Sequence, residues 1–539
     1  MIPTFRILLH LSAALALGAC SSIHHADFAT TGASHQFQTD ANRAALVQAL
    51  AAADHASVGG FKDVADKQRY NAATERAVAA WLSLSDEAAR RNGLEVRSAE
   101  GSYRVNASWP ENLLFDELIP AHTIKGKELK RHIIRDGVGA TFVAHWKYSK
   151  DRKTTEPFLT KAGYAVPVTA TIEFRHEADG VSRATLVLHD PRVQETVRLF
   201  GHEHPLAADL SAFGEFLLAQ KAALMPGIKA MLQSGKYMDK LGILAFERPA
   251  KDRIPVIFVH GLMSRPATWV NVVNELDNDP IIQRNYQIYF FRYPTGVPVT
   301  YSATRFREQI RVLHDQLEQG GNRQLGHHMV LVGHSMGGLV SKMQILESGD
   351  RLWIDIFGSR PEKLGLSQED TRELRQYLEF NPNPYVDRVI FVSTPHRGSE
   401  LAVGTIGAIG RYLISLPVHV MGNTFDFLKG DAPQNPVLRN LIEHGVPNSI
   451  DNFSPKSRFV QWSTSLPMRP GLRVHSIIGN KDGRALTDPK CSDGVVPYTS
   501  AHLNGVESEL VVHSDHGAHE TPEAQAEIRR ILRLHLLSL

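Results

Sequence analysis

The pattern of hydrophobic and polar positions divides the chain into two parts. In the first part, apolar residues recur at helical spacing in two alanine-rich segments between Ala41 and Arg91, and strand-forming residues then cluster from about Leu94 to Phe200. A further helical stretch is expected from about Leu206 to Met231. These elements predict an N-terminal α+β region over residues 36–235 that packs onto the rest of the chain.

From residue 236 to the C-terminus, short apolar runs alternate with amphipathic segments. The runs predict strands at Leu241–Phe246, Pro255–Val259, Tyr286–Phe291, Met329–Val332, Val386–Val392, Gly471–Ile478 and Ser508–Val512. A final helix should begin after Thr521, which can cap it, with Pro522 at its first position. Strands that alternate with helices predict an α/β fold with a doubly wound, mostly parallel sheet over residues 236–539.

Two connections in this second part are longer than such a sheet needs. They cover about residues 348–383 and 399–470. Long insertions near a site are often lids. In the second insertion, apolar residues between Leu401 and Leu413 recur mostly every three or four positions and predict an amphipathic helix. This helix either covers an apolar acyl pocket or has only a structural role.

The most informative stretch runs from Met329 to Val340 and reads MVLVGHSMGGLV. Its apolar start predicts a buried strand, its glycine-rich centre a sharp turn, and its end a helix. A serine on such a turn, here Ser335, can meet both a base and a substrate carbonyl. Side chains at Gly333 or Gly337 would clash, because strand and helix backbones pass close together. An ordinary glycine-rich turn is the alternative, but the surrounding strand and helix favour a nucleophile.

A serine hydroxyl needs a histidine to take its proton and a carboxylate to orient that histidine. After a nucleophile turn of this kind, the acid and then the histidine follow along the chain. Two aspartates follow the sixth predicted strand, and we favour Asp493 in SDGVVP over Asp482 in a charged loop. Three histidines follow the seventh strand, and we favour His516 over His513 and His519.

The tetrahedral intermediate of such a reaction needs backbone N–H donors for its oxyanion. Met336, directly after the predicted nucleophile, should provide one donor. Leu262, in the His-Gly-Leu sequence that ends the second predicted strand, should provide the other. His260 in the same loop precedes the serine, and we expect it to have a structural role.

Composition and charge narrow the remaining possibilities. A chain of 539 residues is too long for one compact core, so two or more domains are expected. The formal net charge of +2 is spread along the chain and gives no electrostatic basis for a nucleic-acid partner. The 26 histidines are mostly scattered, and neighbouring histidines lack further ligands at metal-site spacing. Neither a metal nor a cofactor is therefore predicted.

The N-terminus reads MIPTFRILLHLSAALALGAC. Its apolar run, Ile7–Leu17, is too short to span a bilayer and is typical of a secretory signal. Its end resembles a bacterial lipobox, which implies removal of residues 1–19 and acylation of Cys20; an ordinary signal peptide cleaved near Ala19 is the alternative. Residues 20–35 are expected to be a tether. The serines after Cys20 favour delivery to the outer membrane, by resemblance to Gram-negative lipoproteins.

Four segments carry a family resemblance. HGLMSRPATW, GHSMGG, STPHRGS and SDGVVP, in this order, resemble the lipase and esterase branch of the α/β-hydrolases. The chain looks similar to Gram-negative lipoproteins with an N-terminal extension and a lipase domain like that of the GPI inositol-deacylases. The resemblance covers residues 240–539. It implies a triad of Ser335, Asp493 and His516.

The same resemblance implies Leu262 and Met336 as oxyanion donors. One group of bacterial lipases also holds calcium through an aspartate shortly after the histidine. In this chain Gly517 and Ala518 follow His516, so calcium is not expected. The function that we expect is hydrolysis of carboxylic esters, in particular lipid acyl esters, at a membrane to which the N-terminus is anchored. A phospholipase or an acyltransferase with the same triad, or a non-catalytic envelope scaffold, are the alternatives.

Overall fold

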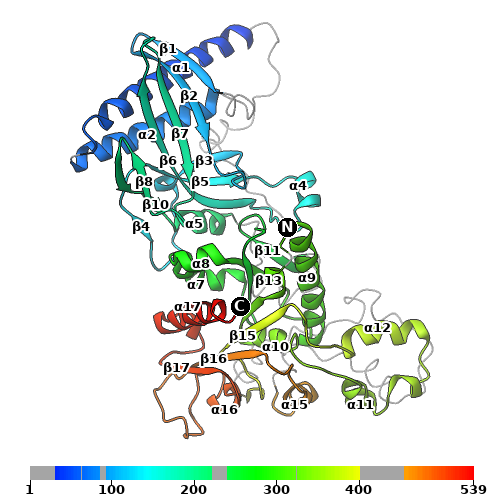
Figure 1. Ribbon diagram of the computed structural model, residues 1–539. Coiled ribbons are helices and arrows are strands. Elements are labelled where there is room, and N and C mark those ends of the chain that lie inside the picture. Colours follow the sequence, from blue (N-terminus) through cyan, green and yellow to red (C-terminus); the bar gives the residue numbers. More distant parts are fainter. Residues whose placement is uncertain (1–30, 62, 85–92, 221–239, 323, 401–453) are drawn as a thin grey trace, which may run out of the picture.

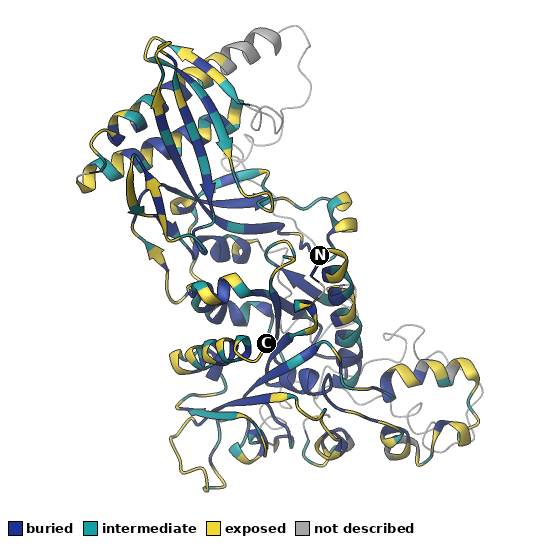
Figure 2. Cartoon of the chain, viewed as in Figure 1, coloured by how far each residue is buried: buried dark blue, intermediate teal, exposed yellow. Residues whose placement is uncertain are grey.

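The computed structural model describes residues 31–61, 63–84, 93–220, 240–322, 324–400 and 454–539 (Figure 1). Two larger sheets organise these residues, one in the N-terminal region and one in the C-terminal region. Buried residues follow the strands of both sheets and the inner faces of the helices that cover them (Figure 2). No described helix is both long and apolar enough to cross a membrane.

The N-terminal sheet has six strands in the order β1-β2-β7-β6-β5-β3. Its strands are β1 (Leu94–Ser98), β2 (Gly101–Ser108), β3 (Glu117–Pro120), β5 (Ala140–Trp146), β6 (Tyr164–His176) and β7 (Ser182–His189). Two long helices, α1 (Thr31–Ser57) and α2 (Val64–Leu84), lie side by side on one face (Figure 1). Leu50 and Trp81 are buried between these helices and the sheet, as their helical spacing predicted. The α+β character of this region is confirmed.

Two predictions for the N-terminal region were wrong in their limits. Helix α1 begins at Thr31, so the last five residues of the predicted tether are helical. Extending an existing helix requires no new nucleation step, which favours helical structure in these five residues. The helix expected from Leu206 begins only at Ala212, as α5 (Ala212–Ala219), because β10 (Ala208–Asp209) pairs with β4 (Ile134–Arg135) first. The rest of that predicted helix, from residue 221, lies outside the described residues.

The C-terminal sheet has seven strands in the order β11-β13-β12-β14-β15-β16-β17. They are β11 (Gly242–Ala245), β12 (Ile254–Val259), β13 (Tyr286–Arg292), β14 (Met329–His334), β15 (Val386–Val392), β16 (Arg473–Gly479) and β17 (Ser508–Val512). Only the first pairing, β11 with β13, is antiparallel among the strands of this sheet. The predicted doubly wound, mostly parallel α/β fold is therefore confirmed.

Helices cover both faces of this sheet, which explains why its strands are continuously apolar. One face packs against α9 (Val299–Gln319) and α10 (Met336–Lys342). The other face packs against α7 (Val270–Asp277) and the final helix α17 (Pro522–Leu536) (Figure 1). The Thr521 hydroxyl accepts a hydrogen bond from the Ala524 N–H at 3.2 Å, so this residue caps α17 as predicted.

The two long insertions contribute helices to the core of the C-terminal region. The first insertion forms α11 (Arg351–Phe357) and α12 (Gln368–Leu378), which bury Trp353 and Leu374. The described end of the second insertion forms α15 (Arg458–Ser465), which buries Trp462 in the same core. The predicted amphipathic helix between Leu401 and Leu413 lies outside the described residues.

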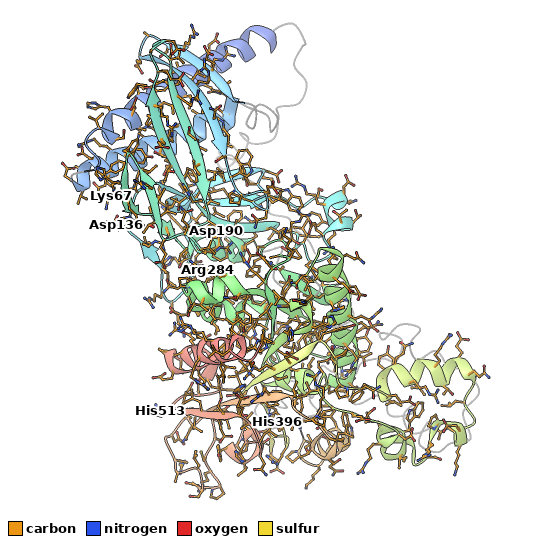
Figure 3. All side chains as sticks on the ribbon, in the orientation of Figure 1. Lys67, Asp136, Asp190, Arg284, His396 and His513 are labelled. Atoms are coloured by element: carbon orange, nitrogen blue, oxygen red, sulfur yellow. The ribbon has the colours of Figure 1, made fainter. Side chains whose placement is uncertain are left out.

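A buried ion pair joins the two regions. Arg192, from the loop after β7, has a side chain that is 5% exposed and contacts Asp190 at 2.8 Å and Glu247 at 3.0 Å. Glu247 belongs to the C-terminal region, in the loop after β11. Figure 3 shows Asp190 close to α8 (Pro280–Asn285), where the regions meet. Because the Arg192 guanidinium is removed from water, it depends on these two carboxylates, which are themselves partly exposed.

We expect Arg192→Met to lower the free energy of unfolding by about 1.5–3 kcal/mol, since it removes charge-assisted hydrogen bonds to the partly exposed carboxylates of Asp190 and Glu247. Urea unfolding followed by circular dichroism measures this loss. Arg131→Met is the matched control, because Arg131 also pairs across the regions, with Glu275 at 3.2 Å, but is 65% exposed. It should cost at most about 1 kcal/mol. Equal losses in the two variants would contradict a special role of the buried pair.

Candidate active site

Ser335 lies on a strained turn between β14 and α10. Its backbone has φ 53° and ψ −122°, a conformation that side-chain-bearing residues seldom adopt. A Cβ atom on Gly333 would lie 2.7 Å from the Gly337 carbonyl oxygen, and one on Gly337 would lie 2.5 Å from the His260 carbonyl oxygen. Both positions therefore require glycine, for the reason that the sequence suggested. The turn presents the Ser335 hydroxyl at the carboxyl end of the sheet.

The structure brings Ser335, His516 and Asp493 together in one chain of hydrogen bonds. His516 Nε2 lies 2.9 Å from Ser335 Oγ, and His516 Nδ1 lies 2.8 Å from Asp493 Oδ2. An ionised carboxylate can only accept, so Nδ1 carries the proton and Nε2 is left to accept from the serine hydroxyl. The three side chains thus have the arrangement that base-assisted nucleophilic attack requires.

Of the two candidate aspartates, the structure places only Asp493 against the histidine. Its side chain is buried, and its second carboxylate oxygen accepts hydrogen bonds from the Val495 and Val496 N–H groups at 2.8 and 2.7 Å. Asp482 is exposed and pairs with Arg484 at 3.4 Å. The turn formed by the SDGVVP segment therefore fixes the carboxylate.

The three candidate histidines occupy different environments. His513 follows β17 and is exposed at the edge of the molecule (Figure 3). His519 is buried, its Nε2 lies 3.0 Å from the Thr268 hydroxyl, and burial lowers its pKa to about 4. Only His516 of the three contacts Ser335.

The two predicted oxyanion donors, Leu262 and Met336, belong to the backbone segments next to Ser335. Met336 is the first residue of α10, so its N–H has no acceptor within the helix. Leu262 follows β12 in a loop that approaches the nucleophile closely: a Cβ on Gly261 would lie 3.1 Å from the Ser335 Cβ. Among the described residues, neither N–H donates to a protein acceptor. Leu262 and Met336 therefore remain the predicted donors.

The oxyanion loop is held by residues that the sequence analysis did not single out. Met263 has φ 58° and donates its N–H to the Thr295 hydroxyl at 3.2 Å. Tyr293 stacks on His260 and donates its hydroxyl to the His260 carbonyl oxygen at 2.7 Å. His260 itself is buried with its Nε2 unpartnered, and burial lowers its pKa to about 4, so it is a neutral structural group. Tyr293 and Thr295 lie just after β13, at the carboxyl edge of the sheet. In the sequence, only this position indicated that they belong to the site.

A hollow of about 450 Å³ opens beside the acid and the histidine. Its lining includes Thr268 and the charged residues Lys481, Asp515 and Glu520. In the described parts of the chain, no group of three or more His, Cys, Asp or Glu side chains could hold a metal ion.

Comparison with known proteins identifies the family. The sequence model of the alpha/beta hydrolase family matches residues 256–528, which is half of the chain, and the protein belongs to this family. It is a hydrolase by this membership. No curated protein matches the sequence.

Solved structures match the chain at low similarity. The mature Bacillus licheniformis lipase BlEst2 is 17% identical, with a TM-score of 0.28, over 53% of this chain and 94% of that one. EstA from Clostridium botulinum is 13% identical, with a TM-score of 0.32, over 57% of this chain and 98% of that one. The metagenomic carboxyl esterase MGS0156 is 14% identical, with a TM-score of 0.29, over 54% of this chain and 77% of that one. Identities and TM-scores this low do not support assigning the activity of these enzymes to this protein.

Proposed function

We propose that the protein is a serine hydrolase of carboxylic esters that acts through Ser335, His516 and Asp493. The observation that carries this proposal is the unbroken chain of hydrogen bonds from the buried Asp493 through His516 to Ser335. The backbone N–H groups of Leu262, in the loop packed on Ser335, and of Met336, the next residue in the chain, are the oxyanion donors of this proposal. A scaffold without activity would have no use for a strained serine turn together with this arrangement.

In the first half of the reaction, Ser335 Oγ attacks the ester carbonyl carbon while His516 Nε2 takes the hydroxyl proton. The carbonyl oxygen becomes an oxyanion, which the Leu262 and Met336 N–H groups stabilise. Asp493 holds His516 in the tautomer that can accept this proton and stabilises the imidazolium that forms. His516 then returns the proton to the leaving alkoxide, the carbon–oxygen bond breaks, and an acyl group remains on Ser335.

In the second half, water replaces the alcohol. His516 takes a proton from the water, which attacks the acyl carbonyl carbon, and the same two N–H groups stabilise the new oxyanion. Collapse of this intermediate releases the carboxylic acid, and His516 returns the proton to Ser335 Oγ. A phospholipase would use the same steps, and an acyltransferase would replace water with another alcohol.

We expect a fluorophosphonate probe to label the wild-type protein and not Ser335→Ala, because only an activated serine attacks phosphorus. Gel fluorescence or intact mass measures the labelling. Ser393→Ala is the matched control: Ser393 also ends a strand with positive φ, 46°, but its buried hydroxyl has no hydrogen-bond partner. It should label like wild type. A wild-type protein that does not label, or a Ser335→Ala protein that does, would refute the assignment.

For the acid, Asp493→Asn should lower kcat on a p-nitrophenyl ester by about 10⁴-fold, because the amide no longer selects the tautomer that His516 needs. Asp482→Asn, which removes an exposed carboxylate of the same type, should leave kcat near the wild-type value. Steady-state kinetics on the two purified variants make the comparison. The reverse order of effects would move the acid to Asp482.

We propose further that the esters are lipid acyl esters and that an acylated Cys20 anchors the enzyme to a membrane. The support for the anchor is the signal-like N-terminus, which lies outside the described residues. Membrane fractionation should find the wild type with membranes and Cys20→Ser in the soluble fraction. Activity should rise with acyl-chain length in a panel of p-nitrophenyl esters and phospholipids. Unchanged membrane association of Cys20→Ser would refute the anchor, and a preference for short acyl chains would refute the lipid substrate.

A further inference from the structure

His334, the residue before the proposed nucleophile, makes a contact that the triad does not include. Its Nε2 lies 2.8 Å from the backbone carbonyl oxygen of His516. The two residues are 182 positions apart in the sequence. Because His334 and Ser335 are neighbours, the backbone that carries the nucleophile also holds the loop that carries the base.

The protonation state of His334 follows from its surroundings. A carbonyl oxygen only accepts, so Nε2 must carry the hydrogen. His334 Nδ1 is buried and has no hydrogen-bond partner. A second proton there would create a buried, unpaired charge, and burial accordingly holds the pKa of His334 well below its ordinary value. The side chain therefore remains a neutral donor to the His516 carbonyl throughout the cycle.

Neighbouring rings keep this donor in place. The His519 ring centroid lies 4.4 Å from that of His334, and His519 is itself held by the Thr268 hydroxyl. The His516 ring lies at 4.9 Å and Trp269 at 6.3 Å. His334 therefore has little freedom to turn away from the carbonyl that it contacts.

We infer that His334 is a positioning residue that clamps the loop of the base to the nucleophile turn. This inference rests on the proposed function of Ser335 and His516. The reasoning is geometric: the bond between Ser335 Oγ and His516 Nε2 must break and re-form in each half-reaction, whereas the backbone contact takes no part in proton transfer. The clamp thus keeps the base in reach while the hydrogen bond between base and nucleophile is absent.

The test compares His334→Leu, which removes the donor, with His334→Gln, whose amide N–H can reach a carbonyl and cannot become charged. His334→Leu should lower kcat by about 10²-fold with little change in KM, because a small displacement of a catalytic group has this cost. His334→Gln should recover most of kcat. Steady-state kinetics and the rate of fluorophosphonate labelling measure both effects.

A matched histidine in the N-terminal region separates positioning from general packing. His145 is also buried, and its Nε2 also lies 2.8 Å from a backbone carbonyl oxygen, that of Ala162. His145→Leu should lower the thermal unfolding temperature and leave kcat unchanged. If folded His334→Leu retains wild-type kcat, or folded His334→Gln is as impaired as His334→Leu, the clamp is refuted.

A spectroscopic measurement keeps the clamp testable without activity. In ¹⁵N-histidine-labelled Ser335→Ala, the Nδ1–H of His516 that donates to Asp493 should give a distinct downfield resonance. Adding His334→Leu should broaden or abolish this resonance, and adding His334→Gln should preserve it. An unchanged resonance in the Leu variant would overturn the clamp. Failure of the wild type to label or hydrolyse esters would instead overturn the proposed function.

Discussion

The active site depends on how closely α10 approaches the strands at its N-terminal end. Gly333 and Gly337 permit this approach, because any side chain there would overlap backbone atoms of the neighbouring segments. Two neighbouring glycines have the same effect. Gly261 lets its loop lie against Ser335, and Gly479 leaves room for Asp493, because a Cβ on Gly479 would lie 2.8 Å from the Asp493 Cβ. Backbone packing therefore places Ser335, Asp493 and the proposed oxyanion donors Leu262 and Met336.

Burial also controls charge around the serine. It lowers the pKa values of His260 and His519 to about 4, so these two rings stay neutral near pH 7. His516 differs because its ring is partly exposed and contacts the buried Asp493 carboxylate. In the proposed reaction, the Asp493 carboxylate compensates the positive charge that His516 carries as an imidazolium. The surrounding histidines act as neutral spacers and hydrogen-bonding groups.

The N-terminal region contacts segments next to the loops of the proposed active site. The Lys130 backbone N–H donates to the Asn271 side chain at 2.9 Å, and the Lys130 ammonium pairs with Glu520. Asn271 lies in α7, shortly after the oxyanion loop, and Glu520 lies four residues after His516. Together with the buried pair of Arg192 and Glu247, these contacts make the region part of the structure that supports the catalytic loops.

The sequence by itself determined the seven strands of the C-terminal sheet, the cap of its last helix and the serine turn. These features depend on local hydrophobic patterns and on glycines at fixed spacing, so neighbouring residues suffice to predict them. Local patterns gave the wrong helix boundary where strands distant in sequence pair. The pairing of β10 with β4 delays the start of α5 relative to the prediction. Only the tertiary structure decided between Asp482 and Asp493 and among the three histidines, and only it revealed Thr295 and His334. The physical reason is that these roles depend on distances between side chains on separate loops, which folding sets and sequence spacing does not.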